Sequence, residues 1–563
     1  MLRAMSRAFV LAPLLLASCF SPGEGIEPPL ERLYFPVGLA RSPGATRLYV
    51  ANSDFDLQFN GGALQVYDLE RLRALVPRGC ASDSDCAADE RCDLEPTDEN
   101  DGYPSHWCVA QTGADAGRPC GALGEKSVAD RLVQPGRCDY VDPDDPEDGG
   151  SSLIVDSVGI GAFATDVVYR SRPPTADGSE RPGGRLFLPV RGDATLHFIE
   201  VDDDSKAERT GFELECGQNT NSGDCDDQHR VGDDPDQENT RDLRLPPEPF
   251  AVDASADGRA IVVTHQVDGA ASLFVNDWDG GTREPPRLEF VAGGMPSRVV
   301  GVAAVPEPQV VAEAGINYQP GFLVTFRDSA EIRLLRYFAD AGMGEPTNPP
   351  RPYLQQSAAV AIEANSTGFD SRGVAVESSE RAACERDCPT EAGEERIACL
   401  SACAAIPLRV FVANRTPSSV LVGQTRPTAT VTSSGDVPQF NASVPLPFGP
   451  SRVEVGSVIG RDGHALTRVF VVCFDTAAIA IFDPEARQVE HWVRTGRGPH
   501  AFTVDVDPEA DPSAGRDPRY ALGYVGHFTD SYIGVIDLDQ RNTQTYGEII
   551  MTVGAPTPPR ASK

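Results

Sequence analysis

The sequence is poor in basic residues, methionine and tryptophan. Its 563 residues include 49 Lys and Arg against 84 Asp and Glu, which gives a formal net charge of −35, and only 5 Met and 3 Trp. Neutralising phosphates takes a basic surface, so this balance argues against a non-specific nucleic-acid binder. Hydrophobic residues still form 40% of the chain, enough for a large core, and exclude a wholly disordered protein.

Short catalytic and cofactor motifs are also absent. The chain has no C-x-x-C-H haem site, no G-x-x-x-x-G-K-[ST] phosphate loop, no H-E-x-x-H zinc helix and no G-x-S-x-G nucleophile turn. Its 8 histidines do not pair at the spacing of helical metal ligands. The sequence therefore predicts no cofactor and offers no catalytic residue.

The longest apolar run lies at the N-terminus. Arg3 and Arg7 precede the run 8–17, which is too short to cross a hydrocarbon core of about 30 Å. This pattern is typical of a secretory signal peptide. It ends in residues 16–19, LASC, which resemble the lipobox of bacterial lipoproteins. The alternative is an ordinary signal peptide with an incidental cysteine.

The lipobox resemblance implies how the chain is processed and where in the cell it is located. Residues 1–18 would be removed, and Cys19 would carry a lipid such as palmitate, with residues 19–29 as a flexible tether. Phe20 stands where retention in the inner membrane usually requires Asp. We therefore expect an outer-membrane lipoprotein that contacts the membrane only through its lipid, on the periplasmic or the cell-surface side.

Export explains the remaining cysteines, since disulfides form in oxidising compartments. Six of them lie in a segment, 78–150, with few apolar residues: Cys80, Cys86, Cys92, Cys108, Cys120 and Cys138. We expect disulfides to stabilise this segment, although the sequence does not choose their pairing. Cys216 and Cys225 flank a polar loop and pair most simply with each other.

Four cysteines in residues 379–406 form two pairs with a spacing of four. That spacing places both members of a pair on one helix face. Two such helices packed antiparallel would join Cys384 to Cys403 and Cys388 to Cys399, and this arrangement resembles the twin C-x3-C helical hairpin. A zinc site is the alternative, which export disfavours. Cys473 remains and lies in an apolar strand, where we expect an inert buried thiol.

A repeated unit fills residues 30–555. In each unit a turn, often with proline, precedes an apolar strand, and further strands follow. The first strands begin near Pro36, Ala162, Pro249, Pro296, Asp370, Pro450 and Pro499. Seven four-stranded units predict an all-β protein, a seven-bladed β-propeller. An array of β-sandwiches is the alternative, but it would not restart seven times with a similar strand.

Some units carry an aromatic-Val-x-Asn strand followed by a Val-Ile-Asp strand. Asn52, Asn414, Asp68 and Asp537 occupy the matching positions. These units resemble the YVTN family of propeller repeats, and the other blades are degenerate copies.

The spacing of the units locates three insertions. The segment 78–150 falls between the third and fourth strands of blade 1, the 216–225 loop between the same strands of blade 2, and the hairpin 379–406 between the first and second strands of blade 5. Because strands alternate in direction, these connections leave from one face of the ring. We expect that face to carry the insertions and the opposite face, here called the bare face, to stay uncovered.

Three consecutive units carry Ser-Arg after their first residue, which gives Arg298, Arg372 and Arg452. We expect these arginines at equivalent positions on one side of the channel at the bare face. There they would attract an anion or a carboxylate ligand. The alternative is structural, with each arginine paired to a turn acid such as Asp328 or Asp475.

Other polar groups have simpler explanations. His265 and His527 end second strands near the channel, where capping a turn is favoured over a metal or acid–base role. The acidic runs 142–148 and 202–204 lack the spacing of a calcium-binding EF-hand, so solvated loops are favoured over calcium sites.

Two functions are consistent with this sequence. The first is a monomeric, non-catalytic binding or scaffold module that presents its disulfide-bonded face to an envelope protein or polysaccharide. The second is a propeller enzyme of the lactonase or hydrolase kind, which would need a metal-binding carboxylate set on its inner strands. Those strands begin mostly with small or apolar residues, Asp253 and Glu454 excepted. The first function is favoured.

Overall fold

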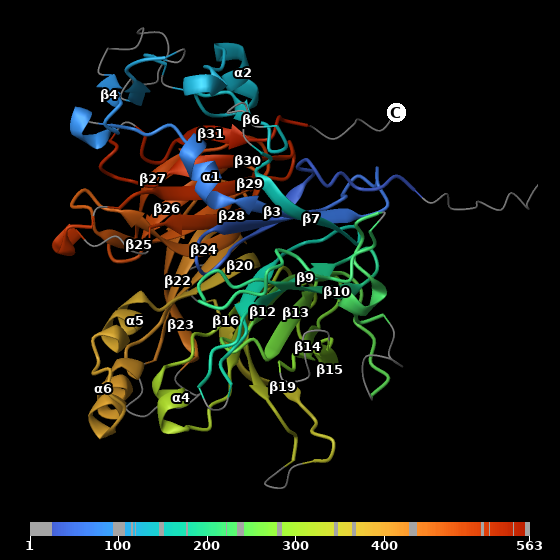
Figure 1. Ribbon diagram of the computed structural model, residues 1–563. Coiled ribbons are helices and arrows are strands. Elements are labelled where there is room, and N and C mark those ends of the chain that lie inside the picture. Colours follow the sequence, from blue (N-terminus) through green and yellow to red (C-terminus); the bar gives the residue numbers. More distant parts are fainter. Residues whose placement is uncertain are drawn as a thin grey trace, which may run out of the picture.

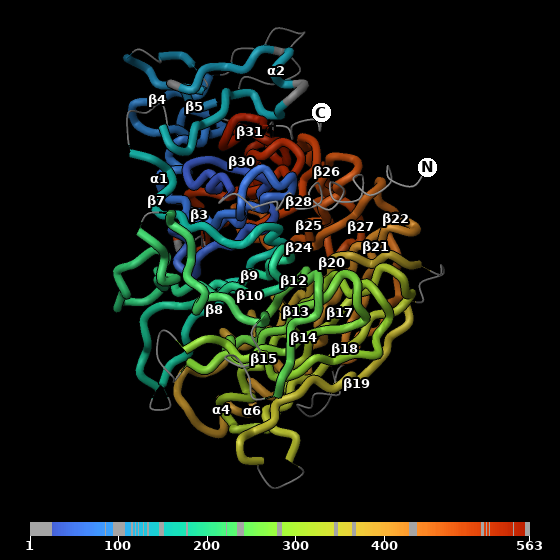
Figure 2. Tube along the Cα trace, turned by 90° about the vertical axis from the view of Figure 1, so that its right-hand side faces the viewer, coloured from blue at the N-terminus to red at the C-terminus, as the bar shows by residue number. Residues whose placement is uncertain are grey.

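The computed structural model describes residues 25–557, apart from residues 81, 94–106, 114–115, 119, 146–150, 176–177, 221, 234–240, 279–283, 343–346, 363–367, 427–435, 508–511, 517 and 544. The chain forms seven consecutive four-stranded antiparallel blades around one axis (Figures 1 and 2). This confirms the all-β class and the seven-bladed propeller. The predicted signal peptide and Cys19 lie outside the described residues.

The strands of each blade follow chain order from the axis outward. Blade 1 holds β1 (Pro36–Arg41), β2 (Arg47–Asn52), β3 (Gly62–Asp68) and β7 (Ile154–Ile160), and blade 2 holds β8 (Val168–Ser171), β9 (Gly184–Val190), β10 (Thr195–Val201) and β11 (Arg230–Val231). Blade 3 holds β12 (Pro249–Ala254), β13 (Ala260–His265), β14 (Ala271–Val275) and β15 (Arg287–Ala292), and blade 4 holds β16 (Val299–Ala304), β17 (Gly321–Phe326), β18 (Glu331–Phe338) and β19 (Tyr353–Ala361).

The remaining blades repeat this order. Blade 5 holds β20 (Phe369–Glu377), β21 (Arg409–Thr416), β22 (Ser418–Thr425) and β23 (Pro438–Pro445), and blade 6 holds β24 (Pro450–Ile459), β25 (Ala465–Cys473), β26 (Ala478–Asp483) and β27 (Gln488–Arg494). Blade 7 holds β28 (Pro499–Val506), β29 (Ala521–His527), β30 (Tyr532–Asp537) and β31 (Ile549–Val553).

The core lies between the blades. Second and third strands such as β9 and β10 are buried at every residue, because a neighbouring blade covers each side of the sheet. The outermost strand β27 instead alternates between exposed and half-buried residues over most of its length. Apolar side chains on both faces of the middle strands therefore stack one blade on the next.

The first strands share one local geometry. Near the start of each first strand one residue has a positive φ, between +52° and +85°. These residues are Phe35, Phe163, Glu248, Arg298, Asp370, Gly449 and Gly498. In blades 1–4, 6 and 7 the carbonyl of this residue accepts a hydrogen bond from the end of the second strand, as in Arg327 N–H to Arg298 O at 3.0 Å. A β-bulge follows within two or three residues in six of the blades, which redirects a side chain there.

The ring closes with help from the first insertion. Strand β1 packs against β28, and β6 (Tyr140–Val141), which belongs to the segment 78–150 of blade 1, pairs in parallel with β31 as a fifth strand of blade 7. The N–H of Phe35 donates to Ser531 Oγ at 3.1 Å across the same seam. Strand β6, from the insertion of blade 1, thus connects blade 1 to blade 7.

The six cysteines of this segment form three disulfides. Cys80 pairs with Cys92, Cys86 with Cys108 and Cys120 with Cys138. The first two hold the small hairpin of β4 (Glu90–Asp93) and β5 (Trp107–Ala110), and the third lies beside β6. The helix α1 (Leu69–Leu75) precedes the segment, and α2 (Val128–Val133) lies within it.

The other cysteines pair as expected. Cys384 bonds to Cys403 and Cys388 to Cys399 between α5 (Ser379–Arg386) and α6 (Glu394–Ala404), and Cys216 bonds to Cys225. These sulfurs are in disulfides, so the zinc alternative does not apply. Cys473 is free and buried, and burial raises the pKa of its thiol to about 12, which makes it unreactive.

The three insertions are not confined to one face, which corrects that expectation. They leave blades 1, 2 and 5 between the predicted strands, but β6 continues along the outer edge of blade 7. Cys225 N–H donates to Gly159 O on the outermost strand of blade 1. Only the hairpin stays on its face, where Leu400 packs against Val310 of α4 (Val310–Ala314).

The end of the predicted tether also contacts the ring. The N–H of Asn60 donates to Ile26 O at 2.9 Å, and the Gln65 amide donates to Leu30 O. Residues 26–30 therefore lie against blade 1 instead of forming a free linker. Among the described residues, no helix is long and apolar enough to span a membrane.

Candidate functional site

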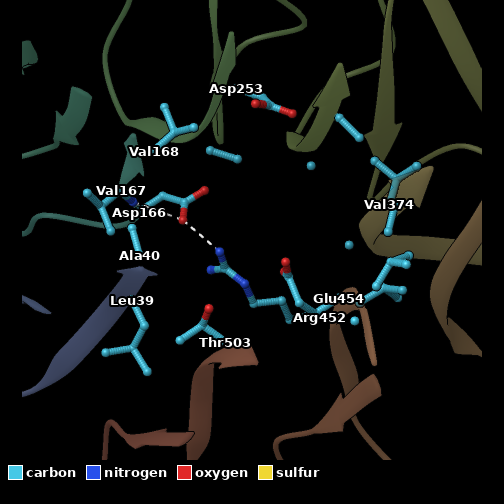
Figure 3. Close-up of a pocket in the computed structure, with 18 of the residues that line it drawn as sticks. Leu39, Ala40, Asp166, Val167, Val168, Asp253, Val374, Arg452, Glu454 and Thr503 are labelled. Carbon is cyan, nitrogen blue, oxygen red and sulfur yellow. Dashed lines mark hydrogen bonds and ion pairs between the residues drawn. The ribbon is translucent and has the colours of Figure 1, made fainter. Parts of the chain in front are cut away.

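A cavity of about 1080 Å³ lies on the propeller axis and is lined by the first strands of all seven blades (Figure 3). Each strand presents residues at fixed distances after its positive-φ residue. We call the second residue after it the bulge position, the third the channel position and the fifth the lower position.

The channel position is Gly or Ala in five blades. Its residues, in order of blades, are Gly38, Asp166, Ala251, Gly301, Gly373, Arg452 and Ala501. Small side chains keep the first strands close to one another around the axis. At Gly301, for example, an added Cβ would lie 2.2 Å from the Arg372 carbonyl oxygen. The two exceptions, Asp166 and Arg452, carry opposite charges.

Those two side chains meet across the channel. Arg452 Nη2 lies 2.9 Å from Asp166 Oδ1, as the dashed line in Figure 3 shows. The residues belong to blades 6 and 2, which are separated by three blades on one side of the ring and by two on the other. The ion pair therefore spans the axis of the propeller. The Arg452 side chain is 23% exposed and the Asp166 side chain 14%.

Two further carboxylates, Asp253 and Glu454, occupy the lower position and also line the cavity (Figure 3). Asp253 accepts from Arg170 Nη2 at 2.5 Å and from Ala304 N–H at 2.7 Å, so it is fully engaged. No such partner holds Glu454 among the described residues. The pKa of Glu454 is raised to about 7, mainly by burial; the charge of Arg452 opposes this rise, and the charges of Asp166 and Asp253 contribute to it.

His500 occupies the bulge position of blade 7. Its Nδ1–H donates to Val37 O at 3.1 Å, which leaves Nε2 as the unprotonated nitrogen. Burial and the charge of Arg452 lower the pKa of His500 to about 4. It is therefore a neutral imidazole at pH 7.

The three predicted arginines are not equivalent in register. Arg298 is itself a positive-φ residue, Arg372 is at the bulge position and Arg452 is at the channel position. The Ser-Arg dipeptide recurs at different offsets from the positive-φ residue, so the equivalence that the shared dipeptide predicts is wrong. Only Arg372 and Arg452 line the cavity.

Their partners differ as well. Arg298 lies 3.5 Å from Asp328, an exposed pair of the kind that the structural alternative anticipated. Arg372 binds Asp370 through Nε at 2.5 Å and Nη2 at 3.2 Å. Asp475 is paired with Arg415 instead of with Arg452.

Asp166 is not among the site residues that the sequence predicts. The repeat pattern predicts a start of blade 2 at Ala162, but the bridge of Ala164 to Val190 places Ala164 where Pro450 stands in blade 6. Aligning Val167 with Val453 would have found the acid, because both valines directly follow the channel position.

The remaining candidates have structural roles. His265 and His527 are fully buried, Nε2 of the first bonds Ser272 Oγ at 2.8 Å, and Nε2 of the second accepts from Gly496 N–H at 3.1 Å. Burial lowers their pKa values to about 4 and about 3. Asp204 accepts hydrogen bonds from the 42–46 turn of blade 1, so the acidic run 202–204 holds blade 2 against blade 1. The run 142–148 is only partly described.

Aromatic rings surround the end of the channel on the bare face. Phe528 contacts Phe35 and Phe55 with ring centroids 5.1 and 5.0 Å apart, and its neighbours Phe474 and His500 lie 6.3 and 6.0 Å away. Four loops of blades 1, 6 and 7 bring these rings together. We call this ring-lined end the channel mouth.

The bare face also exposes large apolar side chains. They lie in its loops or at the start of a first strand, and are Phe55 (47% exposed), Leu57 (63%), Val267 (51%), Phe369 (50%) and Phe448 (74%). A group of exposed apolar side chains around a cavity is typical of a binding surface.

These features define a seven-bladed β-propeller with a polar, ion-paired channel and an aromatic mouth. No protein-family model matches the chain, and no curated protein matches it. Solved structures that align with it include putative 6-phosphogluconolactonases from Bacteroides fragilis (10% identity, 83% of this chain and 86% of that chain, TM-score 0.39) and Bacteroides uniformis (11%, 82% and 86%, 0.40). Saccharomyces cerevisiae Sqt1 aligns at 7% identity over 96% and 92%, with a TM-score of 0.42.

Proposed function

We propose that this protein is a lipid-anchored binding or scaffold module of the outer membrane, and that it binds an envelope protein or polysaccharide with its bare face. The observation that carries the proposal is the group of exposed apolar side chains around the channel mouth, with Phe448 at 74% and Phe55 at 47% exposure. Holding such groups in water is unfavourable, and a bound partner would cover them.

The bare face is preferred over the face that carries the helical hairpin. On that face the apolar side chains already have partners within the chain, since Leu400 and Cys403 are buried against Val310. Polar contacts such as Arg396 with Glu313 surround this cluster. The hairpin therefore supports blades 4 and 5, and the binding surface is assigned to the opposite side.

The test compares two double variants. Phe55→Ser with Phe448→Ser removes apolar surface from the bare face, and Val155→Ser with Trp492→Ser removes exposed apolar surface from outer strands. Purified proteins are incubated with solubilised envelope proteins and, separately, with envelope polysaccharide. We expect the bare-face variant alone to lose at least tenfold of the wild-type binding. Equal binding by both variants would contradict the proposal.

A second candidate function has one specific observation in its favour. Glu454 faces the cavity with a pKa of about 7, which suits a general acid or base at neutral pH. A propeller lactonase or hydrolase working in the channel would use it. Assays on a panel of lactones and esters test this: activity that Glu454→Gln abolishes would favour the enzyme, and activity unchanged in that variant would exclude this role of Glu454.

A further inference from the structure

Three arginines converge beside the channel mouth on only two acids. Arg372 and Arg327 share the carboxylate of Asp370, with Nε atoms 2.5 and 3.4 Å from Oδ1. Arg415 pairs with Asp475. We call these three residues, Arg327, Arg372 and Arg415, the arginine cluster. Together with their two acids they carry a net charge of +1.

Other arginines of the cavity wall differ in their pairing. Arg452 faces Asp166 and Arg170 faces Asp253, each with its own acid. Arg41 instead shares Asp505 with Arg73, which lies outside the lining. The excess at Arg372 lies in the cavity wall itself, in a chain whose net charge is −35. Burial is the main cause that lowers the pKa of Arg372; Asp370 opposes it, and the charges of Arg327 and Arg415 add to the lowering.

Hydrogen-bonding capacity also remains in this cluster. Arg372 uses Nε and Nη2 on Asp370, and Arg415 uses Nη2 on Asp475. In the described part of the chain, Nη1 of each makes no hydrogen bond with the protein. Both arginines line the cavity, and its lining also includes Phe474 and Ser451.

We propose that the channel mouth binds an oxyanion of its ligand, a carboxylate or a phosphate, through Arg372 and Arg415. An oxyanion there would offset the excess charge and accept from the two Nη1 groups. Arg327 acts as a positioning residue, because it shares Asp370 and leaves Arg372 partly uncompensated. The inference rests on the proposed function, since it names the chemistry that the bare face would recognise in its partner.

The test uses inorganic phosphate, D-galacturonate and D-galactose as probes in calorimetric titrations of the full chain at low ionic strength. Galactose is the matched control for galacturonate because it lacks the carboxylate. We expect phosphate, galacturonate or both to bind saturably, with affinity that falls as salt is added. Binding of phosphate alone or of galacturonate alone assigns the group, and either result supports the site.

Variants locate the binding. Arg372→Gln should weaken it at least tenfold, and Arg298→Gln is the matched control, since Arg298 makes an exposed pair outside the cavity lining. Asp370 keeps Arg327 as its partner in Arg372→Gln, which favours correct folding, and Arg415→Gln serves as a second variant. Absence of saturable anion binding by the wild type would overturn the site. Equal anion binding by Arg372→Gln and by the control Arg298→Gln would overturn it as well.

The two proposals fail in different ways. If the Phe55/Phe448 variant loses its partner while Arg372→Gln keeps it and no anion binds, the oxyanion site is wrong and the binding face stands. If the Phe55/Phe448 variant keeps its partner, the binding face is wrong whatever the anion titrations give.

Discussion

At the scale of single residues, the channel depends on pairing between distant side chains. Gly and Ala hold the channel position in five blades, so the side chains of Asp166 and Arg452 can reach across the axis. The effective dielectric constant is lower there than in bulk water, and the attraction between the two charges is correspondingly larger. The pair therefore links blades that share no sheet contact.

We predict that Asp166→Asn and Arg452→Gln each reduce the free energy of unfolding by about 1–3 kcal/mol, because each leaves a poorly solvated charge without its partner. Thermal denaturation measures the loss. The double variant should lose less than the sum of the two. Arg298→Gln, in an exposed pair, is the control and should cost less than about 1 kcal/mol. Strict additivity in the double variant would contradict a direct interaction.

Glu454 gives a pH-dependent prediction. Its carboxyl holds a proton up to a pH of about 7 in the folded protein, against an ordinary value of 4.5. The folded state binds the extra proton between these values, so the contribution of Glu454 to stability falls as the pH rises from about 4.5 to about 7. Glu454→Gln should therefore melt higher than the wild type at pH 8, and the difference should shrink toward pH 4.5. A difference that does not vary with pH would refute this.

At the scale of elements, the segment 78–150 joins blade 1 to blade 7, and we call this connection the clasp. Strand β6 extends blade 7, and Cys120 and Cys138 lie in the same apolar cluster as Met551 and Val553 of β31. The Gln134 amide donates to Gly554 O at 3.0 Å beyond that strand. An insertion that leaves blade 1 thus stabilises the seam between the first and last blades.

Removing the Cys120–Cys138 disulfide should open this seam. The bridge closes a loop with a sequence separation of 18, for which loop-closure entropy predicts a loss of about 3 kcal/mol. Hydrogen exchange in β31 is the measurement, and Cys120→Ala with Cys138→Ala should accelerate it. Cys80→Ala with Cys92→Ala is the control, because that bridge lies in the β4–β5 hairpin. Equal acceleration in both variants would count against the clasp.

At the scale of the whole molecule, the ring has two unlike faces. One carries the disulfide-bonded hairpin α5–α6 with α4, and the other carries the aromatic channel mouth. Residues 26–30 lie against blade 1, so a lipid on Cys19 would hold the ring close to the membrane by a short segment. Ile26 accepts from Asn60 N–H in the same loop of blade 1 as Phe55 and Leu57, so the proposed anchor would start beside the proposed binding face.

The anchor is tested at this scale. We predict that Cys19→Ala moves the protein from the outer-membrane fraction to the soluble periplasmic fraction, because no lipid is then attached. Cell fractionation and labelling with radioactive palmitate make the measurement. Cys473→Ala is the control cysteine variant, since that thiol is free and buried in the blade. Membrane retention of Cys19→Ala without label would show that the lipobox interpretation is wrong.

Much of the architecture follows from the sequence alone. A strand buried on both faces must be apolar throughout, and seven such groups separated by turns leave few folds other than a propeller. Cysteines spaced by four on two helices allow one antiparallel pairing, and that pairing is present for Cys384 with Cys403 and Cys388 with Cys399. Local periodicity determines these features, so they can be deduced without the tertiary structure.

The site depends on strand register and on closure of the ring, which local sequence patterns do not specify. A β-bulge shifts the side chains after it, so Arg298, Arg372 and Arg452 share a dipeptide but not a position. Asp166 meets Arg452 because the ring brings blades 2 and 6 to one axis, and β6 reaches β31 because the insertion crosses the seam. Contacts between residues far apart in sequence depend on how the whole ring closes, and local sequence patterns carry no information about them.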